Sequence, residues 1–164
     1  MPVIEPKKGV PKPRGQKEAR YDKALMGPGE YEVTRSSTFT VRMHLSRRDK
    51  NDPWWVLVEE NGAETTEEVV FRMWSYDEMV ELRKMATKYD TVRRVHMIDH
   101  DVLNRLKMQR FMLSWTFEKD NPRLELQHVN GVLTDETWAK VTRLQTNILK
   151  HIIEQMNERY EFGG

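Results

Sequence analysis

The stretch Val69-Val70-Phe71-Arg72-Met73-Trp74-Ser75-Tyr76-Asp77-Glu78 is where the sequence changes from a strand-like to a helix-like pattern. Its first six residues are β-branched, aromatic or otherwise suited to a strand. Ser75 and Glu78 have the Ser-x-x-Glu spacing of a capping box, in which each side chain satisfies a backbone N–H at the start of a helix. We therefore expect a sheet before residue 75 and helices after it.

Two further strands are predicted before this point. From Tyr31 to Leu45 apolar and polar residues alternate, which is the period of a half-buried strand. Residues 54–58, Trp-Trp-Val-Leu-Val, predict another strand. Asn61-Gly62 is a turn dipeptide that favours a hairpin between this strand and the one over residues 69–74. Residues 31–74 therefore predict a small antiparallel sheet.

Residues 75–164 predict three or four helices. After Ser75 an apolar stripe at helical spacing consists of Met79, Leu82, Ala86 and Tyr89. A second helical pattern covers residues 92–111, although Asp99-His100-Asp101 would also suit a cap that divides it in two. Residues 111–117 form an apolar, strand-like run, and residues 124–129 alternate like an edge strand. Thr134 is a good N-cap for a long final helix that ends near Tyr160. The fold class is therefore α+β.

Residues 1–30 differ in composition from the remainder of the chain. They hold five of the seven prolines and four of the eight glycines, with few large apolar residues. Such a segment buries too little apolar surface to offset the entropy lost on ordering. We interpret residues 1–30 as an extended basic arm, followed by one domain over residues 31–164.

The overall composition excludes several classes of protein. With 164 residues the chain has the length of one domain, and it has no cysteine for disulfides, thiol catalysis or thiolate metal sites. No apolar run is long enough to cross a bilayer, and the first residues lack the pattern of a signal peptide. A net charge of +1 gives no overall attraction to nucleic acid or membranes.

Catalytic and metal sites find little support in the sequence. If residues 92–111 are helical, His96 and His100 share a face on which Asp99 or Asp101 would complete a divalent-metal site. That spacing lacks a third histidine or a metalloprotease glutamate. The other histidines are dispersed, and neither a nucleophile elbow nor a phosphate-binding glycine loop is present. Five glutamates surround Asn61-Gly62, where we expect them to be solvated: Glu59, Glu60, Glu64, Glu67 and Glu68. The sequence predicts a non-enzymatic protein without a cofactor or a catalytic or metal site.

Binding to other macromolecules is better supported. Ten methionines and five tryptophans provide adaptable and large contact surfaces, which favours binding to other proteins. Nucleic acid is the alternative partner, because the arm, residues 47–50 and Arg93-Arg94 are basic and exposed tryptophans could stack on bases. The candidate partner-binding residues are Lys7, Lys8, Lys12, Arg14, Trp54, Trp55, Trp115 and Trp138.

The order of motifs from residue 69 to 160 resembles that of small tail proteins of tailed bacteriophages, and most of all their tail assembly chaperones. The resemblance rests on residues 71–82, the Leu113-Ser114-Trp115-Thr116-Phe117 run, the loop after it, and Leu133-Thr134-Asp135-Glu136-Thr137-Trp138 before the last helix. It implies a non-enzymatic part in tail morphogenesis, in the virion or in the host cytoplasm during assembly. The implied partners are tube, tape measure or baseplate subunits, in a homo- or hetero-oligomer. The basic arm and the insertion over residues 121–130 depart from the chaperone pattern and suit a component of the virion tail or baseplate.

Overall fold

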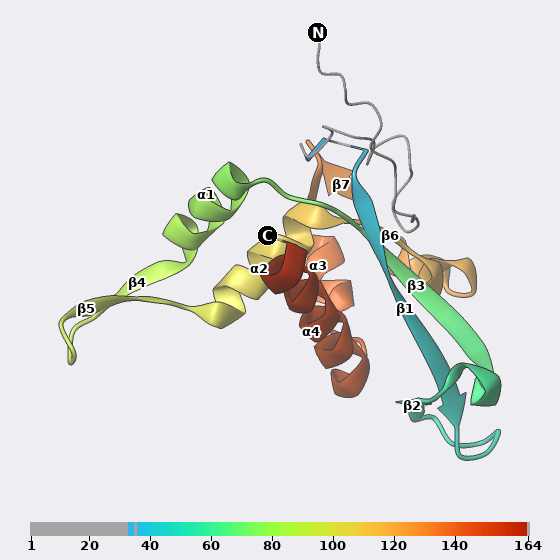
Figure 1. Ribbon diagram of the computed structural model, residues 1–164. Coiled ribbons are helices and arrows are strands. Elements are labelled where there is room, and N and C mark those ends of the chain that lie inside the picture. The colour runs from blue at the N-terminus through green and yellow to red at the C-terminus, as the bar shows by residue number, and fades with distance from the viewer. Residues whose placement is uncertain (1–32, 35, 164) are drawn as a thin grey trace, which may run out of the picture.

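The computed structural model describes residues 33, 34 and 36–163, with side chains as far as Arg159. The predicted arm, with Lys7, Lys8, Lys12 and Arg14, lies outside the described residues. The described part confirms an α+β fold with a small antiparallel sheet and four α-helices (Figure 1).

The main sheet has four antiparallel strands in the order β2-β1-β3-β6. They are β1 (Thr38–Arg47), β2 (Trp55–Leu57), β3 (Thr65–Arg72) and β6 (Met112–Trp115). The alternation predicted for the first strand is confirmed, since Phe39, Val41, Met43 and Leu45 are all buried. The strand-like run predicted over residues 111–117 is a strand only at its centre, where β6 pairs with β3 as the edge of this sheet; Phe111 belongs to the helix before it, and residues 116–117 to a 3₁₀ turn.

The predicted hairpin at Asn61-Gly62 is wrong. β2 and β3 lie on opposite sides of β1 and are not paired with each other. The chain between them forms a 3₁₀ turn, η1 (Glu60–Gly62), instead of a two-residue hairpin loop. The reason is that β1 is ten residues long and pairs on both sides: Leu45 lies opposite both Leu57 of β2 and Thr65 of β3.

The first helix, α1 (Tyr76–Ala86), begins as the capping box predicts. The Glu78 amide donates to Ser75 Oγ over 3.2 Å, and the Ser75 amide donates to Glu78 Oε1 over 3.0 Å. Met79, Leu82 and Ala86 are buried, as the apolar stripe predicts. The helix ends at Ala86, however, so Tyr89 is not part of the stripe and is exposed.

Residues 92–98 are not helical, which corrects the prediction of a helix from residue 92. They belong to a two-stranded antiparallel hairpin, β4 (Thr87–Asp90) and β5 (Val95–Ile98), which we call the ribbon (residues 87–98). The Asp90 carboxylate accepts the amides of Val92 and Arg93 at 2.9 and 3.1 Å, and Arg94 takes a left-handed φ of 58°. These local interactions favour a turn over a helix. The second helix, α2 (His100–Phe111), has Asp99 as its N-cap, which confirms a cap within Asp99-His100-Asp101, although no helix precedes it.

The predicted long final helix is divided into α3 (Asp135–Val141) and α4 (Thr146–Gly163). Thr134 caps α3 as predicted, by accepting the Thr137 amide at 3.1 Å. The division coincides with a tertiary contact, because Gln145 exchanges two 3.0 Å hydrogen bonds with the backbone of Trp55. The apolar periodicity of residues 134–160 does not predict that contact.

The segment between β6 and α3 is more irregular than predicted. It contains the 3₁₀ turns η2 (Thr116–Lys119) and η3 (Pro122–Leu124), followed by a short hairpin of β7 (His128–Val129) and β8 (Val132–Leu133). The predicted edge strand over residues 124–129 therefore exists only at its last two residues. Asn130 and Gly131 form its turn with φ of 54° and 80°.

Figure 1 shows α2, α3 and α4 grouped beside one face of the sheet, whereas α1 lies further out and packs against α2. Between these layers Phe39 stacks on Phe71, and Trp74 stacks on Phe111, with ring centroids 5.2 and 4.8 Å apart. The opposite face of the sheet is polar: Arg42 pairs with Glu68 across the strands. Among the described residues, no helix combines the length and apolarity needed to span a membrane.

Candidate protein-binding surface

The ribbon exposes large apolar side chains. Val92 is 90% exposed, Tyr89 51% and Val95 46%, although they lie within seven residues of one another. Scattered exposed apolar residues are ordinary on a protein surface, but these three lie on one short projecting element. Tyr89, opposite His96, and Val95, opposite Asp90, lie on the two different faces of that element. Figure 1 shows the ribbon extending away from the sheet and from α2, α3 and α4.

The ribbon is also basic. It carries Lys88, Arg93 and Arg94 against the single acid Asp90, a net charge of +2. Lys88 pairs with Asp99 at 3.2 Å, and Arg93 lies 3.9 Å from Asp90, so both are partly neutralised. Within the described part of the chain, Arg94 at the turn makes no ion pair.

Few interactions hold the ribbon to the body. The Asp99 amide donates to the carbonyl of Ala86 over 2.8 Å at the base of the ribbon. The Asp99 carboxylate accepts the amides of Val102 and Asp101 and the ammonium of Lys88, and these donors lower its pKa. Towards the turn, the ribbon keeps itself together by strand pairing and by the contact of Tyr89 with His96, whose ring centroids are 5.2 Å apart. A two-stranded hairpin of this kind is marginally stable alone in water.

A second exposed apolar group lies at the far end of the main sheet. We call residues 46–64 the sheet end; they comprise the last two residues of β1, the β1–β2 turn, β2, η1 and the two residues after it. Trp54, Val56 and Leu57 are exposed there, Trp54 to 48%. The sheet end carries three basic residues against five acidic ones, a net charge of −2. Glu59 and Glu60 are exposed next to the apolar side chains.

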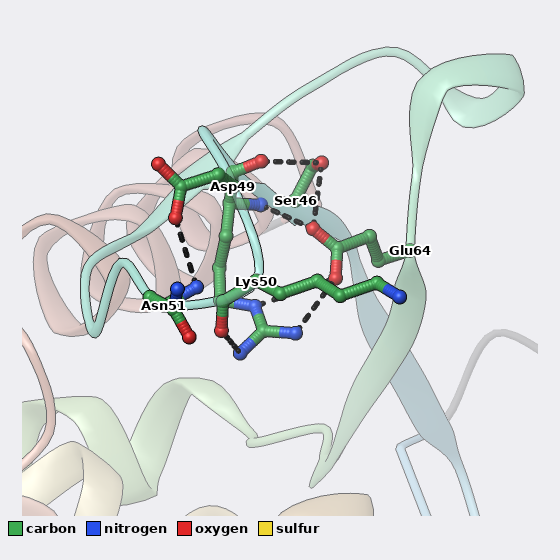
Figure 2. Close-up of polar contacts among 6 residues, drawn as sticks. Ser46, Asp49, Lys50, Asn51 and Glu64 are labelled. Atoms are coloured by element: carbon green, nitrogen blue, oxygen red, sulfur yellow. Dashed lines mark hydrogen bonds and ion pairs between the residues drawn. The ribbon is translucent and has the colours of Figure 1, made fainter.

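A polar network fixes the conformation of the sheet end (Figure 2). The Glu64 carboxylate accepts the Arg47 amide at 2.7 Å and the Arg47 guanidinium at 3.1 Å. The same guanidinium donates to the carbonyl of Lys50 over 3.1 Å and lies 4.5 Å from the ring centroid of Trp55. The Arg47 amide, together with its side chain and Ser46, lowers the pKa of Glu64 despite partial desolvation. This network orders the β1–β2 turn before any partner binds.

The outer edge of β2 is closed at Trp55. Gln145 and Asn147, at the start of α4, donate to the Trp55 carbonyl, and Gln145 also accepts the Trp55 amide, each over 3.0 Å. Covering an edge strand in this way opposes the addition of a foreign strand. A partner at the sheet end would therefore be recognised mainly through side chains.

The four candidate tryptophans lie in different environments. Trp54 is exposed, while Trp55 and Trp138 are half-buried against the core. Trp115 is only 4% exposed, and its indole N–H donates to the carbonyl of Leu124 over 2.7 Å. In the folded chain the side chain of Trp115 therefore belongs to the core, which is the other environment that a tryptophan at this position could have. Of the four, Trp54 is the most exposed.

The hypothesis of a metal site assumed that His96 and His100 lie on one helix, and the structure does not have that helix. His96 lies on β5 and His100 begins α2, so the two do not share a helical face. No group of three histidine, aspartate, glutamate or cysteine side chains in the described ranges could hold a metal ion. The remaining histidines are dispersed over β1, β7 and α4.

The expectation that all five glutamates are solvated is wrong for one of them. Glu67 faces the core from β3 and is 6% exposed. Its carboxylate accepts the hydroxyl of Thr116 at 2.5 Å and that of Thr65 at 3.0 Å. Thr116 also accepts the Glu68 amide at 2.8 Å, so this group ties β3 to η2.

Sequence reasoning missed the ribbon as a site. The signal was present in the β-branched residues Thr87, Val95 and Ile98 and in the turn-forming Asp90, but the helical interpretation of residues 92–111 obscured it.

Comparison with known proteins adds no assignment: no protein-family model, curated protein or solved structure matched this chain.

Proposed function

We propose that this chain is a non-enzymatic assembly protein that binds other proteins through the ribbon. The observation that carries the proposal is the exposure of Tyr89, Val92 and Val95 on a projecting element that contributes little to the core. Aromatic and aliphatic side chains on such an element gain most of their burial only when a partner covers them.

The biological setting that we propose is the morphogenesis of a bacteriophage tail. The chain would act as a structural component of the tail or baseplate in the virion, or as a tail assembly chaperone in the host cytoplasm. This part of the proposal rests on the resemblance over residues 69–160 and on the arm over residues 1–30, which suits contact with neighbouring subunits. Tube, tape measure or baseplate subunits are the proposed partners.

The experiment is co-expression of the full chain with the tube, tape measure and baseplate proteins encoded in the same genome, followed by size-exclusion chromatography. We expect a complex with at least one of them, and we expect Val92→Ser to weaken it. Val129→Ser is the matched control, because Val129 is 61% exposed on β7, away from the ribbon. Absence of any complex, or equal weakening by both substitutions, would refute the proposal.

Nucleic-acid binding is a second candidate, and the ribbon is the observation that favours it. A two-stranded ribbon fits the major groove of DNA, and Arg93 and Arg94 lie at its turn. Among the four candidate tryptophans, Trp54 is the most exposed and so the most open to stacking on bases, whereas Trp55 is half-buried. This candidate predicts an affinity for duplex DNA that falls steeply with salt and is lost in Arg93→Glu/Arg94→Glu. A flat salt response would exclude it.

A further inference from the structure

The two exposed apolar groups lie at opposite extremities of the molecule. Figure 1 shows β4 and β5 at the far left and β2 at the lower right, with the helices between them. The ribbon of one molecule therefore cannot cover its own sheet end. Any contact between these two surfaces must join two copies of the chain.

The two surfaces have opposite charge. The ribbon has a net charge of +2 and the sheet end a net charge of −2. Arg93 and Arg94 lie at the turn of the ribbon, and Glu59 and Glu60 are exposed just after β2 in the chain. Opposite potentials steer encounter and exclude partners of like charge.

The ribbon and the sheet end also carry similar sets of exposed apolar side chains. Each element carries one aromatic and two aliphatic side chains that are substantially exposed: Tyr89, Val92 and Val95 on the ribbon, and Trp54, Val56 and Leu57 at the sheet end. Because side chains alternate along a strand, Tyr89 and Val95 lie on opposite faces of the ribbon, and Val56 and Leu57 lie on opposite faces of β2. A partner would therefore contact both faces of each element. Apolar residues surrounded by complementary charges are the usual composition of a protein interface. Because Gln145 and Asn147 close the β2 edge at Trp55, the contact would be made by side chains.

We infer that the ribbon of one copy docks on the sheet end of a second copy, so that the chain assembles head to tail. Such a heterologous contact leaves one free ribbon and one free sheet end on every dimer. Repetition closes into a ring if the rotation per copy allows closure, and otherwise produces an open filament. The inference rests on the proposed function of the ribbon as a binding element and adds the identity of one partner.

The test uses charge reversal at each end of the full-length chain, followed by sedimentation velocity over a range of concentrations. The first variant, Arg93→Glu/Arg94→Glu, has two acidic surfaces, and the second, Glu59→Lys/Glu60→Lys, has two basic ones. Each should remain monomeric where the unmodified chain assembles, with an affinity at least about 100-fold weaker, because juxtaposed like charges oppose docking. Lys119→Glu/Arg123→Glu, on exposed residues of η2 and η3, is the control and should assemble normally.

Mixing the two variants gives the decisive result. In the mixture each ribbon meets a sheet end of opposite charge on the other variant, so assembly should return to within about tenfold of the unmodified affinity. If the unmodified chain stays monomeric, if the charge reversals have no effect, or if the mixture stays dissociated, the inference is overturned. These outcomes would not refute the proposed function, because a monomeric chain could still form the complex with tail proteins described above.

Discussion

The layered body and the ribbon represent two different uses of apolar residues. In the body, Phe39, Phe71 and Phe111 are buried between the sheet and the helices and hold the elements together. In the ribbon, Tyr89 and Val92 lie on the surface and are not part of the core. The buried residues of the body supply the stability of the chain, and under the proposed function the exposed residues of the ribbon supply contact with other proteins. The predictions below test this division of roles, beginning with the largest expected effect on folding.

Phe71→Ala should destabilise the body most. Phe71 is fully buried and stacks on Phe39, so its truncation leaves a cavity and should lower the free energy of unfolding by about 3–5 kcal/mol. Chemical denaturation followed by circular dichroism measures the loss. Met108→Leu is the control, because it nearly conserves volume at another fully buried position and should cost less than about 1.5 kcal/mol. Equal effects of the two would argue against a closely packed core.

Thr116→Val should have the next largest effect. The substitution removes the hydroxyl that donates to the buried Glu67 and accepts the Glu68 amide. Leaving buried polar groups without partners should cost about 1–3 kcal/mol in the same denaturation experiment. An unchanged unfolding midpoint would show that the link between β3 and η2 does not contribute to stability.

Ser75→Ala should cost about 0.5–2 kcal/mol, because it removes the N-cap of α1. The exposed Ser114 on β6 provides a matched serine outside a cap, and Ser114→Ala should change stability by less than about 0.5 kcal/mol. Since α1 leads directly into β4, the substitution also tests how far the ribbon depends on the helix. A cost for Ser114→Ala as large as that for Ser75→Ala would contradict the assignment of the cap.

Val92→Ser should change the free energy of unfolding by less than about 0.5 kcal/mol, because Val92 is exposed at the turn of the ribbon. It should nevertheless weaken binding to a partner. This combination separates the two roles most clearly, and calorimetry together with size-exclusion chromatography measures both properties on one sample. A large loss of stability would assign the ribbon to the body instead.

The smallest expected effect concerns pH and the sheet end. The pKa of Glu64 is lowered in the folded chain, so its contribution to stability is fully present above the ordinary glutamate pKa of about 4.3 and is lost as the pH falls through the lowered value. Glu64→Gln should therefore lower the thermal midpoint slightly at neutral pH, and the difference should shrink in acid. A difference that grows on acidification would have the wrong sign for this account.

The sequence predicted those parts of the fold that depend on local patterns. The alternation in β1, the capping box at Ser75 and the cap at Thr134 all appear where expected, because each depends on residues within a few positions. The pairing of β1 on both sides and the division between α3 and α4 depend on tertiary contacts such as that of Gln145 with Trp55. Periodicity within one segment does not encode such contacts.

The candidate site was predicted less well than the fold. Large apolar residues are equally compatible with a core and with an interface, so tryptophan content did not distinguish the buried Trp115 from the exposed Trp54. Whether a given tryptophan is exposed depends on the tertiary structure, which a local sequence pattern does not determine. The ribbon was missed because the apolar spacing over residues 92–111 suits a helix, whereas the side chain of Asp90 stabilises a turn.

Hydrogen exchange, resolved by residue and measured with and without assembly, tests the division between body and ribbon most directly. In the unassembled chain we expect amides of residues 87–98 to exchange through local opening, much faster than those in the centre of β1 and β3. On binding to a partner, the ribbon amides should become protected while those of β1 and β3 change little. Ribbon amides that are as slow as those of β1 in the free chain, and unaffected by assembly, would contradict the account.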